Sequence, residues 1–467
     1  MKYISTRGKA PDLSFCDALL TGLARDGGLY IPEQWPTLSE TEIRDMANRP
    51  FHENAKHILY PFVAGEIPKS DFYKMVDEAY STFYHPAIAP LVQVDSNHWV
   101  MELFHGPTLA FKDVAMQLLA RMMDFVLAER RQKATIVGAT SGDTGSAAIE
   151  AFKGRDNTDI FILFPKGKVS PVQQRQMTTV VDANVHCLAI EGDFDDCQAL
   201  VKEMFNHLDF RDRLQLSGVN SINWGRIMAQ IVYYFTTASS LGAPDRKMSF
   251  TVPTGNFGDI FAGYAAKRMG LPIETLIIAT NQNDILNRTL STARYETAST
   301  TPTISPSMDI QVSSNFERLL FDACGRNAET IRNQMASLKQ SGSFEISPEA
   351  MAMIRTEFSA GACDEPTTKK QIHNTLQTTG YLCDPHTAVG LYVAQQHLSQ
   401  NHPMITLATA HPAKFPDAVR ESTGINPALP AHLGDMMERP ERFYTLPNDV
   451  RKIESYIEAN SRAVKVA

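Results

Sequence analysis

The chain has 467 residues, which is enough for about three folding units at the usual size of roughly 150 residues per domain. Its composition, with 43% hydrophobic and 21% charged residues, 26 Gly and 26 Pro, excludes wholesale disorder, collagen-like repeats and a coiled-coil rod. The net charge of -8 gives no basic footprint for nonspecific binding to nucleic acid or to an anionic membrane. We therefore expect a folded soluble protein without nucleic-acid or membrane partners.

The N-terminus and the cysteines indicate a cytoplasmic protein. Arg7 and Lys9 precede any apolar run long enough for a secretion signal. The uncharged stretch 227–244 contains polar side chains, so it is typical of a buried or amphipathic helix rather than a bilayer span. The cysteines are scattered, with no CxxC pair and no histidine at metal-ligand spacing, so we expect free thiols and no metal site: Cys16, Cys187, Cys197, Cys324, Cys363 and Cys383.

Up to about residue 90 the sequence is typical of short amphipathic helices and turns. Residues 15–20 predict a helix that ends near Gly22, and Asp26-Gly27-Gly28 predicts a turn. From residue 134 onward, predicted strands and helices alternate, which indicates an α/β fold with parallel strands. The strands are expected at 134–137, 160–164, 185–190, 250–252, 275–279 and 404–408, the helices at 145–152, 195–208 and 259–269, and a Ser/Thr/Pro-rich loop at 291–307.

Gly255-Asn256-Phe257-Gly258 lies between a predicted strand and the N-terminus of a predicted helix. Glycines there let backbone N–H groups converge, and the helix dipole adds positive potential for a phosphate. A plain strand-to-helix turn would use the same residues, so the motif alone leaves both interpretations open. It is neither the dinucleotide GxGxxG pattern nor a P-loop.

The segment 140–145 forms a similar turn that is richer in hydroxyl groups. Its N–H and O–H donors could hold a carboxylate at the entry to the following helix. The alternative is simple N-capping, because Asp143 and Thr144 are good cap residues.

Lys112 lies between Phe111 and Val114, whose apolar side chains we expect to lower the pKa of its amine and make it a nucleophile. A lysine on a solvated helix face is the usual alternative, and the apolar neighbours argue against it. His105, in the same segment, is more typical of a hydrogen-bonded structural histidine than of an acid or base.

Thr409 follows the predicted strand 404–408, at the strand end where ligands of α/β proteins bind. If its neutral hydroxyl meets a pyridine nitrogen, that nitrogen is not held protonated, which favours elimination and replacement over transamination. Alternatively, Thr409 merely ends the strand.

Four segments stand out in chain order: DGGLYIP at 26–32, ELFHGPTLAFKD at 102–113, GATSGDTG at 138–145 and AHPAKFP at 410–416. Together they resemble the threonine synthase family, within the fold-type-II pyridoxal-phosphate enzymes related to tryptophan synthase β and cysteine synthase. The resemblance covers nearly the whole chain and favours the bacterial and fungal subgroup over the plant type activated by S-adenosylmethionine.

The resemblance implies pyridoxal 5'-phosphate as the cofactor, with Lys112 forming the internal Schiff base and Thr409 contacting the pyridine nitrogen. Asp143 stands beside the cofactor hydroxyl, where many relatives have Asn. The cofactor phosphate is expected on Gly255, Asn256, Phe257 and Gly258.

The resemblance also implies the substrate contacts. Ser141, Gly142 and Thr144 are expected to take the substrate carboxylate. Asn223 and Arg226 lie where relatives have Asn-Pro-x-Arg, although the two residues between them depart from that form. That arginine is similar to one that holds the substrate phosphate, for which a planar guanidinium is suited.

The implied activity is that of a carbon-oxygen lyase acting on phosphate. It converts O-phospho-L-homoserine and water to L-threonine and phosphate by γ-elimination and β-addition of water, the last step of threonine biosynthesis. Lys112 is expected to remove the Cα proton, and either Lys112 or the substrate phosphate serves as base afterwards.

Three other functions are weighed against this one. A lyase or dehydratase acting on serine, threonine or an activated homoserine without phosphate is disfavoured by Arg226 and the His105 segment. A silent homologue that only binds cofactor or a partner is disfavoured by Lys112. A nicotinamide dehydrogenase is disfavoured because GxGxxG is missing.

The expected architecture is an N-terminal mainly helical region over 1–90 and a two-lobed catalytic region over 91–440. The lobes span about 91–245 and about 246–440, with the cofactor between them, and a C-terminal helical tail covers 441–467. The subgroup resemblance favours a monomer.

Overall fold

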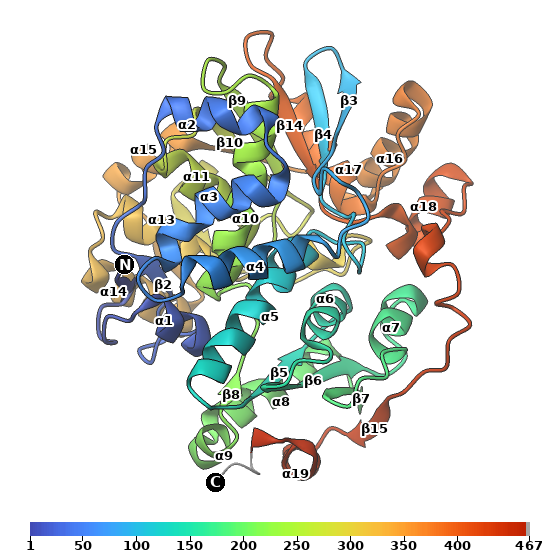
Figure 1. Cartoon of the computed structure of the whole chain (residues 1–467). Helices are drawn as coiled ribbons and strands as arrows, with labels where there is room; N and C mark the ends of the chain where they lie inside the picture. Colours follow the sequence, from blue (N-terminus) through green and yellow to red (C-terminus); the bar gives the residue numbers. More distant parts are fainter. Residues whose placement is uncertain (464–467) are drawn as a thin grey trace.

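The computed structural model describes residues 1–463, which form two mainly parallel sheets, an N-terminal group of helices and a returning C-terminal segment (Figure 1). Within this range, no helix combines the length and the apolar character needed to cross a membrane. Strands and helices alternate through both sheets, so the predicted α/β class is confirmed.

The N-terminal region is mainly helical, as the sequence predicts. A short antiparallel pair, β1 (Tyr3–Ser5) and β2 (Tyr30–Pro32), brackets the first helix, whose Ser14 cap accepts a hydrogen bond from the Asp17 N–H. The third and fourth helices pack on the long helices of the catalytic region. The elements are α1 (Phe15–Thr21), α2 (Glu40–Asp45), η1 (Met46–Asn48), α3 (Phe51–Val63) and α4 (Lys69–Tyr80).

The smaller sheet has five parallel strands in the order β15-β7-β6-β5-β8. Its central strands are buried along their length, which matches their continuous apolar sequence. The strands are β5 (Ala134–Ala139), β6 (Thr158–Pro165), β7 (Val185–Glu191), β8 (Leu216–Ser217) and β15 (Tyr444–Pro447).

The larger sheet has six strands in the order β13-β10-β9-β14-β4-β3, and only the β3–β4 pair is antiparallel. The β14 strand, which the sequence predicts at 404–408, lies at its centre. The strands are β3 (Leu91–Asp95), β4 (His98–Glu102), β9 (Met248–Pro253), β10 (Ile273–Thr280), β13 (Phe358–Ala362) and β14 (Met404–Ala408).

Helices cover the sheets and connect their strands, as right-handed parallel crossovers require. Around the smaller sheet lie α5 (Lys112–Glu129), α6 (Asp143–Phe152), α7 (Pro171–Thr178), α8 (Phe194–Asn206), α9 (Leu208–Arg213) and α19 (Val450–Asn460). Towards the larger sheet lie α10 (Trp224–Ser240), α11 (Gly258–Arg268), α12 (Ile285–Thr292), α13 (Phe316–Ala323), α14 (Ala328–Ser341), α15 (Pro348–Glu357), α16 (Glu365–Thr379), α17 (Pro385–Gln395) and α18 (Pro416–Thr423).

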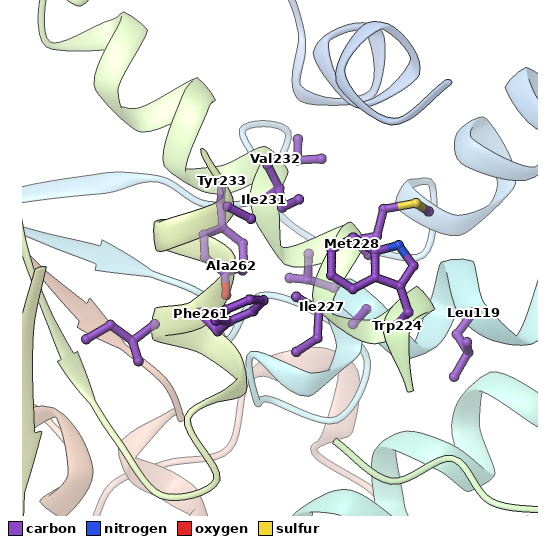
Figure 2. Packing of buried hydrophobic residues seen from close by; sticks show 14 of the residues in the cluster. Leu119, Trp224, Ile227, Met228, Ile231, Val232, Tyr233, Phe261 and Ala262 are labelled. Carbon is purple, nitrogen blue, oxygen red and sulfur yellow. The ribbon is translucent and has the colours of Figure 1, made fainter. Parts of the chain in front are cut away.

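The centre of the main core is α10, which is apolar on nearly every face. Trp224, Ile227 and Ile231 pack there with Leu119 of α5 and Phe261 of α11 (Figure 2). A helix that is apolar all round belongs in the interior of a large domain. Residues 227–240 of the stretch 227–244 therefore lie in a largely buried helix, and residues 241–244 follow its end.

Sheet membership does not follow the expected order of the lobes along the chain. The strands β3 and β4 join the larger sheet although the sequence division placed 91–245 in the first lobe. The tail 441–467 contributes β15 to the smaller sheet before its helix begins. The segment 291–307 is also not all loop, because it contains the end of α12 and β11 (Arg294–Glu296), which pairs with β12 (Ser343–Glu345). Such pairings join segments far apart in sequence, which local patterns do not reveal.

Candidate active site

The carboxyl ends of the two sheets meet at one buried ion pair. Asp143 follows β5 of the smaller sheet, and Lys414 ends η3 (Pro412–Lys414), which follows β14 of the larger sheet. Lys414 Nζ lies 2.9 Å from Asp143 Oδ1. Ligands of α/β proteins bind outside the carboxyl ends of parallel strands, so this meeting point is the candidate active site.

Lys112 and Thr409 are brought together by backbone pairing. Ala110 and Ala410 form an isolated antiparallel bridge, and the Phe111 N–H donates to the Thr409 carbonyl at 2.9 Å. Lys112 therefore begins α5 directly beside the end of β14. In the described part of the chain, the Thr409 side-chain hydroxyl makes no hydrogen bond and is free for a ligand.

The amine of Lys112 is buried, as its apolar neighbours predicted. Only 8% of the residue is exposed, and Nζ lies 4.8 Å from the centre of the Phe111 ring. Burial lowers the pKa of Lys112; the Asp143 carboxylate, at 3.3 Å, opposes this effect, while Lys414 and Arg226 add to it. The arrangement therefore shifts Lys112 towards the neutral amine, which is the nucleophilic form.

The loop 255–258 has the geometry of an anion cradle. The Gly255 carbonyl accepts a 2.6 Å hydrogen bond from Ser313 Oγ, and the Asn256 carbonyl accepts from the Asn315 N–H at 3.0 Å. Because C=O and N–H point in opposite directions across a trans peptide, the N–H groups of Asn256 and Phe257 point away from this supporting segment. They meet the unpaired N–H groups at the start of α11, which together suit a phosphate.

Phe257 and Gly255 show why this loop keeps its shape. Phe257 adopts φ +63°, the left-handed region, and its ring is buried against Phe316 and Phe358. A Cβ at position 255 would overlap the Ser307 carbonyl oxygen. Backbone packing therefore requires glycine at position 255. A glycine that is needed so that the backbone can approach a phosphate would look the same in the sequence.

In the turn 140–145, the residue that caps α6 is not one of the two cap residues expected from the sequence, Asp143 and Thr144. Thr140 Oγ1 accepts from the N–H groups of Gly142 and Gly145, both at 2.9 Å. Asp143 is already inside α6, and its carboxylate turns towards the lysines instead of capping. The capping interpretation of Asp143 is therefore wrong, and Thr140 performs that role.

The expected carboxylate-binding loop lies at the rim of this centre. Ser141 is exposed, Thr144 is half-buried and Gly142 is buried with φ +142°. A Cβ at position 142 would overlap the Gln173 amide. The loop thus presents hydroxyl and N–H donors at the start of α6, which has positive potential for a carboxylate.

Arg226 and Asn223 lie at the start of α10 but behave differently. Arg226 Nη1 donates to the Val219 carbonyl at 3.2 Å, while the buried Nε has no partner among residues 1–463. Burial lowers the pKa of Arg226 to about 10, so the guanidinium stays charged at neutral pH. The positive charge of Arg226 lowers the pKa of Lys112, so the guanidinium lies near that amine.

Both side-chain polar atoms of Asn223 bond to the backbone. Its Oδ1 accepts from the Gly225 N–H and its Nδ2 donates to the Leu19 carbonyl, both at 2.9 Å. It caps α10 and ties the helix to α1. These bonds give Asn223 a structural role, and its expected substrate contact stays a prediction, for which Nδ2 has one further N–H.

Several buried polar residues at this centre were not identified from the sequence. Gln173 Nε2 donates to Asp143 Oδ1 at 2.8 Å, and Lys414 donates to the Thr108 carbonyl at 2.7 Å. Lys414 belongs to the segment AHPAKFP at 410–416, but no sequence pattern indicated that its side chain is buried against Asp143. His105 Nε2 lies 2.7 Å from Glu102 Oε2, which agrees with the structural role expected for it.

A histidine–aspartate pair supports the cradle from outside. His386 Nδ1 lies 2.7 Å from Asp384 Oδ2, and both residues are buried. The Ser307 N–H donates to His386 Nε2 at 3.3 Å, which places the ring proton on Nδ1. This pair fixes the segment whose carbonyl packs against Gly255, and the sequence offered no signal for it.

The residues at this centre fit pyridoxal phosphate. A buried amine of lowered pKa is present in Lys112, an anion cradle opens at the start of α11, and a neutral hydroxyl is available at Thr409. These are the groups needed to hold an aldehyde, a phosphate and a pyridine nitrogen.

Family comparisons match three parts of the chain in order. Residues 2–80 match "Threonine synthase N terminus", residues 82–337 match "Pyridoxal-phosphate dependent enzyme" and residues 387–457 match "Threonine synthase, C-terminal". Together they span the N-terminal helices, both sheets and the C-terminal segment.

Curated relatives agree over nearly the full length. The chain is 53% identical over 460 residues to the threonine synthase of Pseudomonas aeruginosa, covering 98% of both chains. It is 44% identical over 456 residues to the threonine synthase of Schizosaccharomyces pombe, covering 90% of this chain and 88% of the relative.

Solved structures are similar over the whole fold. The crystal structure of PLP-bound threonine synthase from Brucella melitensis has 64% identity and a TM-score of 0.97, covering 99% of this chain and 100% of that one. The yeast threonine synthase has 38% identity and a TM-score of 0.94, covering 98% of each chain. Maize serine racemase, at 12% identity and a TM-score of 0.50, covers 73% of this chain and 92% of its own and shares the fold alone.

Proposed function

The chain belongs to the threonine synthase family of pyridoxal-phosphate-dependent enzymes, and on that premise we propose which of its residues bind O-phospho-L-homoserine and convert it, with water, to L-threonine and phosphate. When bound, the cofactor supplies an electron sink for negative charge that develops at the substrate's Cα. Lys112 holds its aldehyde, the loop 255–258 its phosphate and Thr409 its pyridine nitrogen.

The environment of Lys112 is the single observation that carries this proposal. Its Nζ is buried 3.3 Å from Asp143, and burial together with the charges of Lys414 and Arg226 lowers the pKa of the amine against the opposing effect of that carboxylate. Once the substrate amine has displaced it, Lys112 accepts the Cα proton. Lys112 is then an ammonium and must release that proton before it can take another, so the Cβ proton goes either to the substrate phosphate or to Lys112 after that release. The γ-phosphate departs with the electron pair of its bond to Cγ, protons return to Cγ and Cα, and water adds its hydroxyl to Cβ.

The start of α6 supports the binding of the substrate carboxylate. Ser141 and Thr144 present hydroxyl donors there, whereas the N–H of Gly142 is taken by Thr140, which holds the turn in place through its bonds to Gly142 and Gly145. Holding the carboxylate fixes the Cα–H bond relative to the amine of Lys112, which raises the effective concentration of the base.

Arg226 supports the choice of a phosphorylated substrate. Its guanidinium is buried and charged, and its Nε lacks a partner in the described chain. A planar guanidinium can donate two parallel hydrogen bonds to phosphate, which stabilises the leaving group as its charge grows. This feature favours a threonine synthase reaction over a lyase acting on a substrate without phosphate.

The direct test is release of threonine and phosphate from O-phospho-L-homoserine by the purified chain supplied with pyridoxal phosphate. Equal amounts of both products are expected. Lys112→Ala should reduce turnover at least about 100-fold because it removes the base, while the cradle still binds cofactor noncovalently. Lys369→Ala, a surface lysine paired with Glu421, is the matched control and should keep full activity. Full activity of Lys112→Ala would refute the assignment.

We further propose a cytoplasmic, monomeric enzyme. All six cysteines are free thiols, and most are buried, which suits a reducing compartment. Burial raises the pKa of Cys16, Cys187 and Cys197 to about 12, so these thiols are unreactive. Light scattering of the purified protein tests the oligomeric state.

A further inference from the structure

A second lysine, Lys414, is completely buried at the catalytic centre, with 0% exposure. It has no role in the proposed chemistry so far. Its Nζ lies 2.9 Å from Asp143 Oδ1 and donates to the Thr108 carbonyl at 2.7 Å. A buried ammonium is stable only when it is paired and hydrogen-bonded, and these two contacts satisfy that requirement.

Asp143 is shared by two lysines, but not equally. Lys112 Nζ lies 3.3 Å from Oδ2, whereas Lys414 lies 2.9 Å from Oδ1 and also binds a carbonyl. Gln173 fixes Oδ1 at 2.8 Å. A single buried carboxylate faces two amines here, so charge balance favours one ammonium beside one neutral amine. The more weakly held amine, Lys112, is the one that gives up its proton.

We propose that Lys414 is a positioning residue that takes the Asp143 carboxylate as its own counter-ion and so leaves Lys112 as the neutral amine. Without Lys414, Asp143 would pair with Lys112 and hold it as an ammonium, which is not a nucleophile. The proposal rests on the proposed function in one respect, namely that Lys112 is the lysine that captures the cofactor.

The charged groups facing Lys112 come from four elements. They are Asp143 of α6, Lys414 of η3, Arg226 of α10 and Asp259 at the start of α11. Burial and the two cations lower the pKa of Lys112, and Asp143 raises it. Removing Lys414 takes away one cation and releases Asp143, so both changes act in the same direction, towards protonated Lys112.

The test is the pH dependence of cofactor capture by the cofactor-free, full-length chain. The rate of capture of pyridoxal phosphate is followed by the visible absorbance of the bound cofactor, without any turnover. In Lys414→Met the midpoint of this profile should rise by about 1 to 3 pH units, as expected when an opposite charge pairs with an amine. Lys369→Met, which removes a surface charge, should leave the midpoint unchanged.

Two further variants test whether the carboxylate of Asp143 causes the shift expected in Lys414→Met. In the double variant Asp143→Asn/Lys414→Met, the carboxylate that would capture Lys112 is gone, so the midpoint should return towards that of the wild type. Asp143→Asn alone leaves Lys414 uncompensated and should lower the midpoint. This single variant also decides the question if Lys414→Met does not fold, since an unchanged or raised midpoint in Asp143→Asn would contradict the proposal.

The outcomes also separate this inference from the proposed function. If the wild-type chain captures cofactor and Lys414→Met, shown to be folded by circular dichroism, has an unchanged midpoint, the role of Lys414 is refuted and the function stands. If the wild-type chain captures no cofactor at any pH, the proposed function fails, and the role of Lys414 fails with it.

Discussion

Asp259 shows how burial controls the charge of a single residue at this centre. Its Oδ1 accepts hydrogen bonds from the hydroxyls of Tyr233 and Tyr234, while Oδ2 has no partner in the described chain. Burial raises the pKa of Asp259 to about 7, although the two tyrosines lower it in part. A carboxyl at the first turn of α11 therefore titrates near neutral pH, which no sequence pattern indicated.

We expect Asp259→Asn to remove a pH dependence of the unfolding free energy. The pKa of Asp259 is about 7 in the folded chain against an ordinary value of 3.8. Its proton therefore favours folding below the ordinary value, and this contribution is lost as the pH rises through the folded value. Across that window the loss is up to about 4 kcal/mol.

Urea unfolding of both proteins at several pH values measures this effect. Between about pH 5 and pH 8 the wild type should lose stability relative to Asp259→Asn. Glu33→Gln, an exposed carboxylate-to-amide change, is the control and should follow the wild type. Parallel pH profiles of Asp259→Asn and wild type would show that another group titrates.

At the scale of one element, the first turn of α10 combines a helix cap with the residue that we propose as a substrate contact. Asn223 uses both polar atoms to cap the helix and to hold α1. Arg226, in the same turn, keeps a charged donor without a partner in the described chain. A resemblance in sequence assigned both to the substrate, and their hydrogen bonds separate them.

This separation predicts different defects for two neighbouring substitutions. Arg226→Ala should raise KM for O-phospho-L-homoserine about 10- to 100-fold with unchanged cofactor content, because a charge-assisted hydrogen bond is lost. Asn223→Ala should instead lower the unfolding free energy by about 1 kcal/mol, with KM nearly unchanged. Steady-state kinetics and urea unfolding of both variants measure this. A large rise in KM for a stable Asn223→Ala enzyme would restore Asn223 to the substrate contacts.

At the scale of the whole molecule, the C-terminal segment ties the two sheets together. After α18 the chain returns along the outside of the molecule to the smaller sheet (Figure 1). There β15 pairs with β7, and Ile453 and Ile457 of α19 join the core of that sheet. The Arg462 side chain lies 2.7 Å from Asp159. The last described residues thus close an edge that would otherwise expose unpaired backbone groups.

We expect Ile457→Ala to destabilise the smaller sheet. Ile457 is fully buried, and removing such a side chain from a core costs about 2 to 5 kcal/mol. Hydrogen exchange should show faster opening of β7 and α8 than of β14. Leu398→Ala, at an exposed apolar residue, is the control and should change little. Unchanged exchange in β7 for Ile457→Ala would mean that the segment does not stabilise this sheet.

Local patterns predicted much of the fold and part of the site. The strands at 134–137 and 404–408 and the helix after Gly258 lie where alternation, apolar runs and glycines placed them, because these signals act between near neighbours. The partners of Asp143 were not predictable in this way, since Lys414 reaches it only after both sheets have formed. Burial and long-range contact depend on the whole chain.

By itself, the sequence determined the α/β class, the buried helix at α10 and the burial of Lys112, because each depends on local periodicity or on neighbouring side chains. Only the tertiary structure decided which sheet each strand joins, that Asn223 caps a helix and that Lys414 is the nearer partner of Asp143. These outcomes depend on contacts between segments far apart in the chain and on the burial that such contacts produce. Contact and burial decide which groups are charged and which hydrogen bonds form, and no local pattern contains them.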